Sequence, residues 1–226
     1  MTLSRTKSFF DLDIPGDSQL WFVSDTHFGH RRLVTGSPDH FDTCRTYATT
    51  DEMDSDIRKK WLAAVGDGDT VVFLGDLMFG NFNGRGEEAA RDLLESLPGD
   101  KVLVRGNHDQ KIRGELLDCR DYAAVRWRGM TYLCQHVPFG NGPGADMSVL
   151  ASLKEGLDPA TTVLVHGHTH FTDRYSRTGS RAFSLQNNVC WEAWYGMVDP
   201  GKLYPANRTY VGKCLGHQVV GYFKEG

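Results

Sequence analysis

The sequence has little cysteine and no long apolar stretch, and both features exclude classes of protein. Its 5 cysteines are an odd number, and no Cys-x-x-Cys pair occurs among them, so no disulfide framework is predicted. No apolar run approaches the roughly 18 residues that a membrane-spanning helix requires. The charged start and apolar segment of a secretory signal are also missing. We therefore expect a cytoplasmic protein without membrane association.

Positive charge is not in excess either. Lys and Arg number 25 against 29 Asp and Glu, which gives a formal net charge of −4. This balance argues against a broadly basic face, so stable binding to nucleic acid is not expected. A nucleotide substrate is compatible with the charge, because a metal centre can be locally positive within a mildly acidic protein.

The first half of the sequence predicts a parallel sheet covered by helices. Three short apolar runs, each followed at once by polar residues, predict buried strands at 20–23, 71–74 and 102–104. Apolar residues at helical spacing predict helices over 52–65 and 87–97. Strands that alternate with helices favour parallel pairing with right-handed crossovers.

The second half predicts a second, mixed sheet packed against the first. Strand-like runs occur at 132–134, 162–165, 182–185 and 219–223, with one helix candidate at 147–153. No repeat or low-complexity linker interrupts the 226 residues. We therefore expect a single α/β domain over residues 1–226, built as a sandwich of sheets with outer helices.

Metal-binding residue types follow five of the predicted strands. They are Asp25, His27, Asp76, Asn107, His136, His168 and His170. Ligands of open α/β sheets bind at the carboxyl ends of the strands, so we expect these side chains to share one crevice. Asp, His and Asn are competent ligands for Zn, Mn or Fe, and burying such side chains is costly unless something satisfies them.

These residues resemble the calcineurin-like metallophosphoesterase superfamily. Its motifs stand in order as D-x-H at 25–27, G-D at 75–76, G-N-H-D at 106–109, H at 136 and G-H-x-H at 167–170. The resemblance implies a four-layer αββα sandwich of two mixed sheets flanked by helices, and two metals bridged by one carboxylate and one hydroxide. By the same resemblance, the first metal is held by Asp25, His27 and His170, the second by Asn107, His136 and His168, and both by Asp76.

The charge of this ligand set suits phosphoryl hydrolysis. Two divalent cations against the carboxylates of Asp25 and Asp76 leave about two positive charges, which attract a phosphate anion. Such metals also lower the pKa of a shared water and clamp the oxygens of an in-line displacement. We therefore predict a hydrolase that depends on two divalent ions and acts on a small phosphate ester; the ligand types do not distinguish Mn, Fe, Zn and Ni.

Other residues near the motifs are predicted to act on the substrate. His108 is free to protonate the leaving oxygen, and Asp109 either orients it or caps a helix. His166 is expected to support the ligands from behind or to belong to the core, with direct metal binding as the alternative. His30, Arg31 and Arg85 are candidate substrate contacts, with solvated loop residues as the alternative.

The sequence departs from the motifs of particular branches of the superfamily, and these differences narrow the predicted class of substrate. The protein Ser/Thr phosphatases continue their second motif as G-D-x-V-D-R-G, whereas residues 75–80 read G-D-L-M-F-G, without the Arg that clamps a phosphomonoester. The lipid A pathway hydrolases carry Arg where His108 stands, and no long insertion supplies a cap. The sequence resembles the compact bacterial and bacteriophage-type members. A phosphodiesterase is therefore predicted, with a monoesterase, a nucleotide pyrophosphatase or a non-catalytic metal-binding scaffold as alternatives.

Overall fold

Two β-sheets lie face to face in the computed structural model, which describes residues 8–37, 45–79, 86–109, 112, 117–208, 210–215 and 218–223. The first sheet contains, in order, β2 (Leu20–Val23), β3 (Thr70–Phe73), β4 (Asp100–Val104) and β5 (Cys119–Arg120), all parallel. The second contains, in spatial order, β1 (Phe9–Asp13), β6 (Tyr122–Trp127), β7 (Met130–Gln135), β8 (Thr162–His166), β10 (Leu185–Asn188) and β9 (Tyr175–Arg177). Its strand directions are mixed, with antiparallel β6–β7 and β9–β10 pairs.

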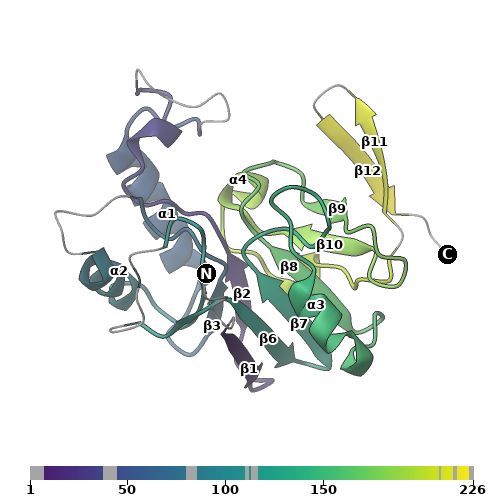
Figure 1. The fold of residues 1–226 in the computed structure, drawn as a ribbon. Helices are drawn as coiled ribbons and strands as arrows, with labels where there is room; N and C mark the ends of the chain where they lie inside the picture. Colours follow the sequence, from purple (N-terminus) through teal and green to yellow (C-terminus); the bar gives the residue numbers. More distant parts are fainter. Residues whose placement is uncertain are drawn as a thin grey trace, which may run out of the picture.

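Helices cover the outer faces of the two sheets. The α-helices are α1 (Thr50–Ala64), α2 (Gly86–Glu95), α3 (Ser148–Leu153) and α4 (Trp191–Trp194), and short 3-10 helices are η1 (Arg31–Leu33), η3 (Lys154–Gly156) and η4 (Pro200–Lys202). Figure 1 shows α1 and α2 on one side of the molecule and α3 on the other. The strands β11 (Tyr210–Leu215) and β12 (Gln218–Phe223) form an antiparallel pair of their own. Within the described ranges, no helix is long and apolar enough to cross a bilayer.

The alternation of side chains along the strands produces the layers. In β3, Val71 and Phe73 pack with Trp61 of α1, whereas Val72 belongs to the core between the two sheets. In β7, Leu133 points the other way and packs with residues of α3. Successive residues of a strand face opposite sides, so each sheet contributes to two cores. The predicted αββα sandwich is confirmed, although in the described residues only the six-stranded sheet is mixed.

The predicted strand at 182–185 was wrong by several residues. The structure places β10 at Leu185–Asn188, so the strand includes Gln186 and Asn187, which are polar but buried. The Asn187 amide donates to the carbonyl oxygens of Leu164 and Tyr204, at 3.0 Å each. Hydrogen bonds satisfy these buried amides, so hydrophobicity does not mark the strand. Strands β1, β5, β6, β9 and β11 and helix α4 were also not predicted.

Candidate metal centre

The ligand loops meet where the carboxyl ends of β2, β3, β4, β7 and β8 share one edge of the sandwich. Backbone hydrogen bonds join the loops: Asp25 N donates to Gly75 O at 2.9 Å, and His27 N donates to Asp76 O at 3.0 Å. On the other sheet, Gly167 N donates to His136 O at 2.8 Å. The five strand exits thus bring together all seven side chains that the sequence singled out.

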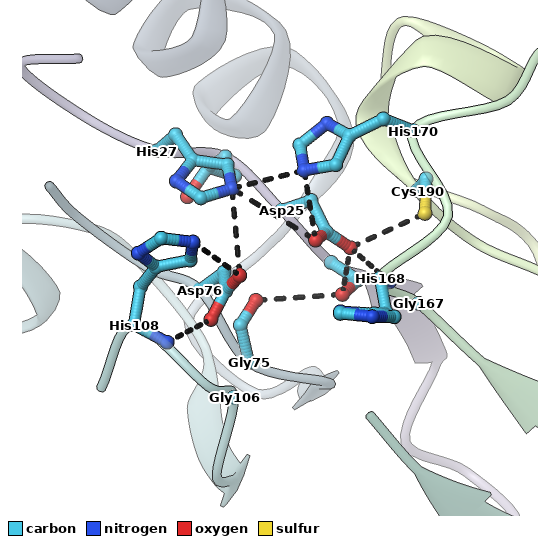
Figure 2. Close-up of polar contacts among 12 residues, drawn as sticks. Asp25, His27, Gly75, Asp76, Gly106, His108, Gly167, His168, His170 and Cys190 are labelled. Carbon is cyan, nitrogen blue, oxygen red and sulfur yellow. Dashed lines mark hydrogen bonds and ion pairs between the residues drawn. The ribbon is translucent and has the colours of Figure 1, made fainter. Parts of the chain in front are cut away.

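A first group of ligand atoms comes from Asp25, His27, Asp76 and His170. His27 Nε2 lies 3.2 Å from His170 Nε2 and 3.5 Å from Asp76 Oδ2. His170 Nε2 lies 3.5 Å from Asp25 Oδ1. Figure 2 shows these four side chains directed toward one another. One atom from each lies within 4.8 Å of all the others, a spacing at which four atoms can bind one ion.

A second group comes from Asn107, His136 and His168. Asn107 Oδ1 lies 2.8 Å from both His136 Nε2 and His168 Nδ1, and these two nitrogens are 3.2 Å apart. His136 Nε2 is also 3.5 Å from Asp76 Oδ2, the oxygen that faces His27 Nε2 at the same distance. One carboxylate oxygen therefore lies between the two groups.

The donor atoms fit divalent cations. Asp25 Oδ1 is buried and has no hydrogen-bond partner among the described residues, although a buried carboxylate oxygen is costly to leave unsatisfied. The other oxygen, Oδ2, accepts from Ser24 Oγ at 2.5 Å, His168 N at 2.9 Å and Cys190 Sγ at 3.3 Å. These donors occupy Oδ2, so Oδ1 is the atom that Asp25 can offer to a cation.

Burial favours the form suited to metal binding at two of the candidate histidines and opposes it at Asp76. Burial, followed by His170, lowers the pKa of His27 well below its usual value. Burial also lowers the pKa of His168. Neutral imidazole is the form that binds metals. The pKa of Asp76 is raised to about 7, chiefly by burial and further by the charges of Asp25 and Asp109. A metal ion would reverse this rise, because it stabilises the carboxylate.

The backbone at the ligands lies in an uncommon region. Left-handed φ values occur at Asp25 (57°), His27 (49°), Asp76 (58°), His168 (73°) and His170 (53°). Such conformations cost on the order of 1 kcal/mol or more for residues other than glycine, and they persist where the surrounding structure enforces them. The packed sheets thus hold the ligand loops in strained conformations.

Two motif glycines leave no room for a side chain. A Cβ at Gly106 would lie 2.1 Å from Asp76 Oδ1, and one at Gly167 would lie 2.0 Å from Ser24 Oγ. Both distances are far below van der Waals contact, so these positions require glycine for the close approach of the loops. This explains physically why the motifs at 106–109 and 167–170 begin with glycine.

His108 lies at the open side of the two groups. Its side chain is 40% exposed, and Nε2 lies 4.0 Å from Asp76 Oδ2. Asp109 was predicted either to orient this ring or to cap a helix, but its carboxylate contacts backbone amides of the ligand loops. Its Oδ2 accepts from Gly106 N and Asp76 N at 2.8 Å each, and its Oδ1 accepts from Leu77 N at 3.2 Å. Asp109 therefore fixes the two ligand loops to each other.

The other predicted residues, His30, Arg31, Arg85 and His166, do not belong to the two ligand groups. The His30 ring is buried and stacks on Phe79, with centroids 3.6 Å apart, and burial lowers its pKa to about 4. A neutral, packed ring offers no positive charge to a phosphate, and a contact of His30 with the substrate stays a prediction. Arg31 is exposed at the start of η1, and Arg85 lies outside the described residues. His166 is fully packed behind the ligand loop, where Nδ1 lies 2.9 Å from Gly167 O.

Sequence reasoning missed a second layer of side chains behind the ligands. Glu192 lies 3.0 Å from His170 Nδ1 and 2.8 Å from Arg45 Nε, and all three contacting atoms belong to largely buried side chains. Cys190 was missed for the same reason as Glu192. Both follow β10, which pairs in parallel with β8. With this strand correctly placed, the strand-exit argument would have included residues 190–192 in the site.

The fold and the two ligand groups define a metal-dependent phosphoester hydrolase. The sequence matches the family model for calcineurin-like phosphoesterases over residues 18–218, and the chain belongs to this family. The resemblance seen in the motifs is thereby confirmed, and so is the class of fold.

Relatives occur in a bacteriophage, an archaeon and a bacterium. The Gene 66 protein of Mycobacterium phage L5 is 30% identical over 209 residues, covering 83% of this chain and 93% of the phage protein. Protein MJ1445 of Methanocaldococcus jannaschii is 32% identical over 120 residues, which cover 53% of this chain and 59% of the MJ1445 chain. The structure of a protein of unknown function from Aquifex aeolicus superposes with a TM-score of 0.57 at 25% identity, covering 82% of this chain and 97% of that one.

Proposed function

We propose that this protein is a dinuclear metallohydrolase that prefers phosphodiesters over phosphomonoesters. The observation that carries the two-metal proposal is the position of Asp76 Oδ2, 3.5 Å from both His27 Nε2 and His136 Nε2. A single carboxylate between two groups of neutral donors suits a bridging ligand. Two ions held there would activate a water and clamp the oxygens of an in-line displacement.

The remaining catalytic work falls to residues of the chain. His108 reaches the open side of the centre, where its ring can give a proton or a hydrogen bond to the leaving oxygen. The backbone His108 N donates to Asp76 Oδ1 at 2.8 Å, which fixes the His108 backbone relative to the proposed bridging carboxylate. Asp109 keeps the two loops together through their backbone amides. Hydrolysis in this site therefore relies on positioning and on charge already in place.

The preference for diesters follows from the side chains after Asp76. Leu77 and Met78 are buried there, and Phe79 is 38% exposed, with its ring centroid 5.5 Å from that of His108. Of these residues, Phe79 offers an apolar surface, and it precedes Gly80, the position at which the motif of the monoesterase branch has its phosphate-clamping Arg. Arg45 does not replace it, because its guanidinium faces the backbone of Asp25 and Thr26 behind the ligands. A diester carries one charge fewer and places a second organic group on such a surface.

The test compares an aryl phosphodiester with the matching aryl monophosphate at one Mn concentration. We expect a higher kcat/KM for the diester, and the ranking should persist when Mn is exchanged for Ni, Zn or Fe. The Asp76→Asn variant, purified in parallel, serves as the control for contaminating hydrolases and should lose both activities. A clear preference for the monoester refutes the substrate assignment, and absence of any phosphoester hydrolysis in metal-loaded protein refutes the function.

A further inference from the structure

Glu192 determines which nitrogen of His170 faces the ligand group. Its Oε1 lies 3.0 Å from His170 Nδ1. The same oxygen accepts from Arg45 Nε at 2.8 Å, and a buried guanidinium at this distance favours the ionised carboxylate. An ionised carboxylate only accepts hydrogen bonds, so Nδ1 carries the proton and donates it. The lone pair of His170 is thus on Nε2, the nitrogen that lies 3.5 Å from Asp25 Oδ1.

Arg45 connects this carboxylate to the first ligand loop. Its side chain is fully buried, and Nε donates to Glu192 Oε1 at 2.8 Å. Nη1 donates to Thr26 O at 2.7 Å, and Nη2 donates to Asp25 O. One guanidinium therefore fixes the backbone of the D-x-H motif and the carboxylate behind His170, although these segments lie far apart in the sequence. Buried ion pairs seldom add net stability, but the hydrogen bonds that Glu192 Oε1 accepts from Arg45 and His170 fix geometry.

The second ligand group is supported differently. His136 Nδ1 lies 2.7 Å from Leu74 O, a neutral backbone carbonyl. Carboxylates behind a ligating imidazole raise its basicity as well as orienting it, more than a carbonyl does. His170 of the first group and His136 of the second thus differ in the charge behind the ring.

We propose that Glu192, held by Arg45, is a positioning residue that sets the metal affinity of the Asp25, His27 and His170 group selectively. The Asn107, His136 and His168 group binds its ion independently of Glu192. This inference rests on the two-metal centre of the proposed function, and it adds a residue that acts on one ion through His170.

The test uses backgrounds that each retain one group. Asn107→Ala leaves the group supported by Glu192, and His27→Ala leaves the other. Binding of Mn²⁺ is measured by calorimetry in both backgrounds, with and without Glu192→Gln, and with no phosphoester present. This substitution keeps the shape of the side chain and removes its charge. The matched control is Glu87→Gln, which alters a buried glutamate of α2 that accepts from Leu117 N at 3.0 Å.

Glu192→Gln should weaken Mn²⁺ binding about 10- to 100-fold in the Asn107→Ala background. Binding in the His27→Ala background should change less than about two-fold, and Glu87→Gln should change neither. Glu192→Met removes the acceptor as well as the charge, so it should lower the Mn²⁺ affinity in the Asn107→Ala background more than Glu192→Gln does. If Glu192→Met does not fold, the near-isosteric Gln variant still decides.

Equal weakening in both backgrounds would assign Glu192 a merely structural role and overturn the proposal, and so would unchanged affinity in the Asn107→Ala background. The proposed function is tested separately. Wild-type protein that binds two ions and hydrolyses no phosphoester refutes that function but leaves the role of Glu192 intact. Failure of wild-type protein to bind metal refutes both.

Discussion

Replacing Asp76 by Asn should make the metal-free protein more stable and the metal-loaded protein less so. Asp76 is 1% exposed and is proposed to bridge both ligand groups. Asn keeps the acceptor for His108 N, which lies 2.8 Å from Asp76 Oδ1, so the loop geometry can persist. What the substitution removes is the negative charge.

The size of the effect follows from the pKa of Asp76. In the metal-free protein, burial and the neighbouring carboxylates raise this pKa from 3.8 to about 7, which corresponds to roughly 4 kcal/mol between the two protonation states. The folded state binds the proton more tightly than the unfolded state, so the stability conferred by this carboxyl is present below about pH 4 and is lost as the pH rises to about 7. The amide of the variant does not titrate and has no such loss. Relative to wild type, the free energy of unfolding of the variant should be unchanged near pH 4 and higher by roughly 4 kcal/mol near pH 8.

Urea unfolding in EDTA, followed by circular dichroism from about pH 4 to 8, measures this difference. The exposed carboxylate of Asp17 gives the control, Asp17→Asn, which should show no such pH-dependent gain. Calorimetry with Mn²⁺ at the higher pH then tests the bridge, because the variant should lose affinity for both ions. A stability difference that does not change with pH would refute the electrostatic reasoning. Stoichiometric binding of two ions by Asp76→Asn would refute the bridging role.

Two further substitutions test the acid and the loop packing. His108→Ala should retain two bound ions and lower kcat roughly 10²–10⁴-fold, with a larger loss for poor leaving groups, as measured with a series of aryl esters; an equal loss across the series would exclude a general acid. Gly167→Ala should lower stability by about 1–3 kcal/mol and weaken Mn²⁺ binding, since its Cβ would lie 2.0 Å from Ser24 Oγ and 2.6 Å from Asp25 Oδ2. Gly142→Ala is the control, because a Cβ there meets nothing within 4 Å, and equal effects of the two substitutions would contradict the packing argument.

The sequence predicted which side chains converge at the candidate metal centre because their signal is local. An apolar strand followed by Asp, His or Asn is visible within a few residues, as at Val23 and Asp25 or at Val104 and Asn107. The carboxyl ends of parallel strands meet at one edge, so the pattern also predicts that these residues converge. The layer order followed from the same short runs.

The supporting residues could not be predicted in this way. Arg45 precedes α1 and contacts Glu192 across 147 positions of the chain, and only the folded backbone brings the two together. Polar residues filled β10, so Glu192 did not appear to follow a strand. Asp109 was recognised, but its partners are backbone amides of another loop, which leave no trace in side-chain patterns.

The left-handed backbone at the ligands places activity and stability in opposition. Asp25, His27, Asp76, His168 and His170 all occupy conformations in which glycine would be less strained. Glycine at position 25 or 76 would lose the hydrogen bonds that these carboxylates accept, whereas the buried His27 Nδ1 has no such partner among the described residues. A laboratory selection that rewards only heat resistance of the metal-free chain should therefore accept glycine first at His27, and that gain would remove a proposed metal ligand. Selection for stability is better carried out with metal present, because metal binding then adds to the stability of the folded state and disfavours variants that have lost a ligand.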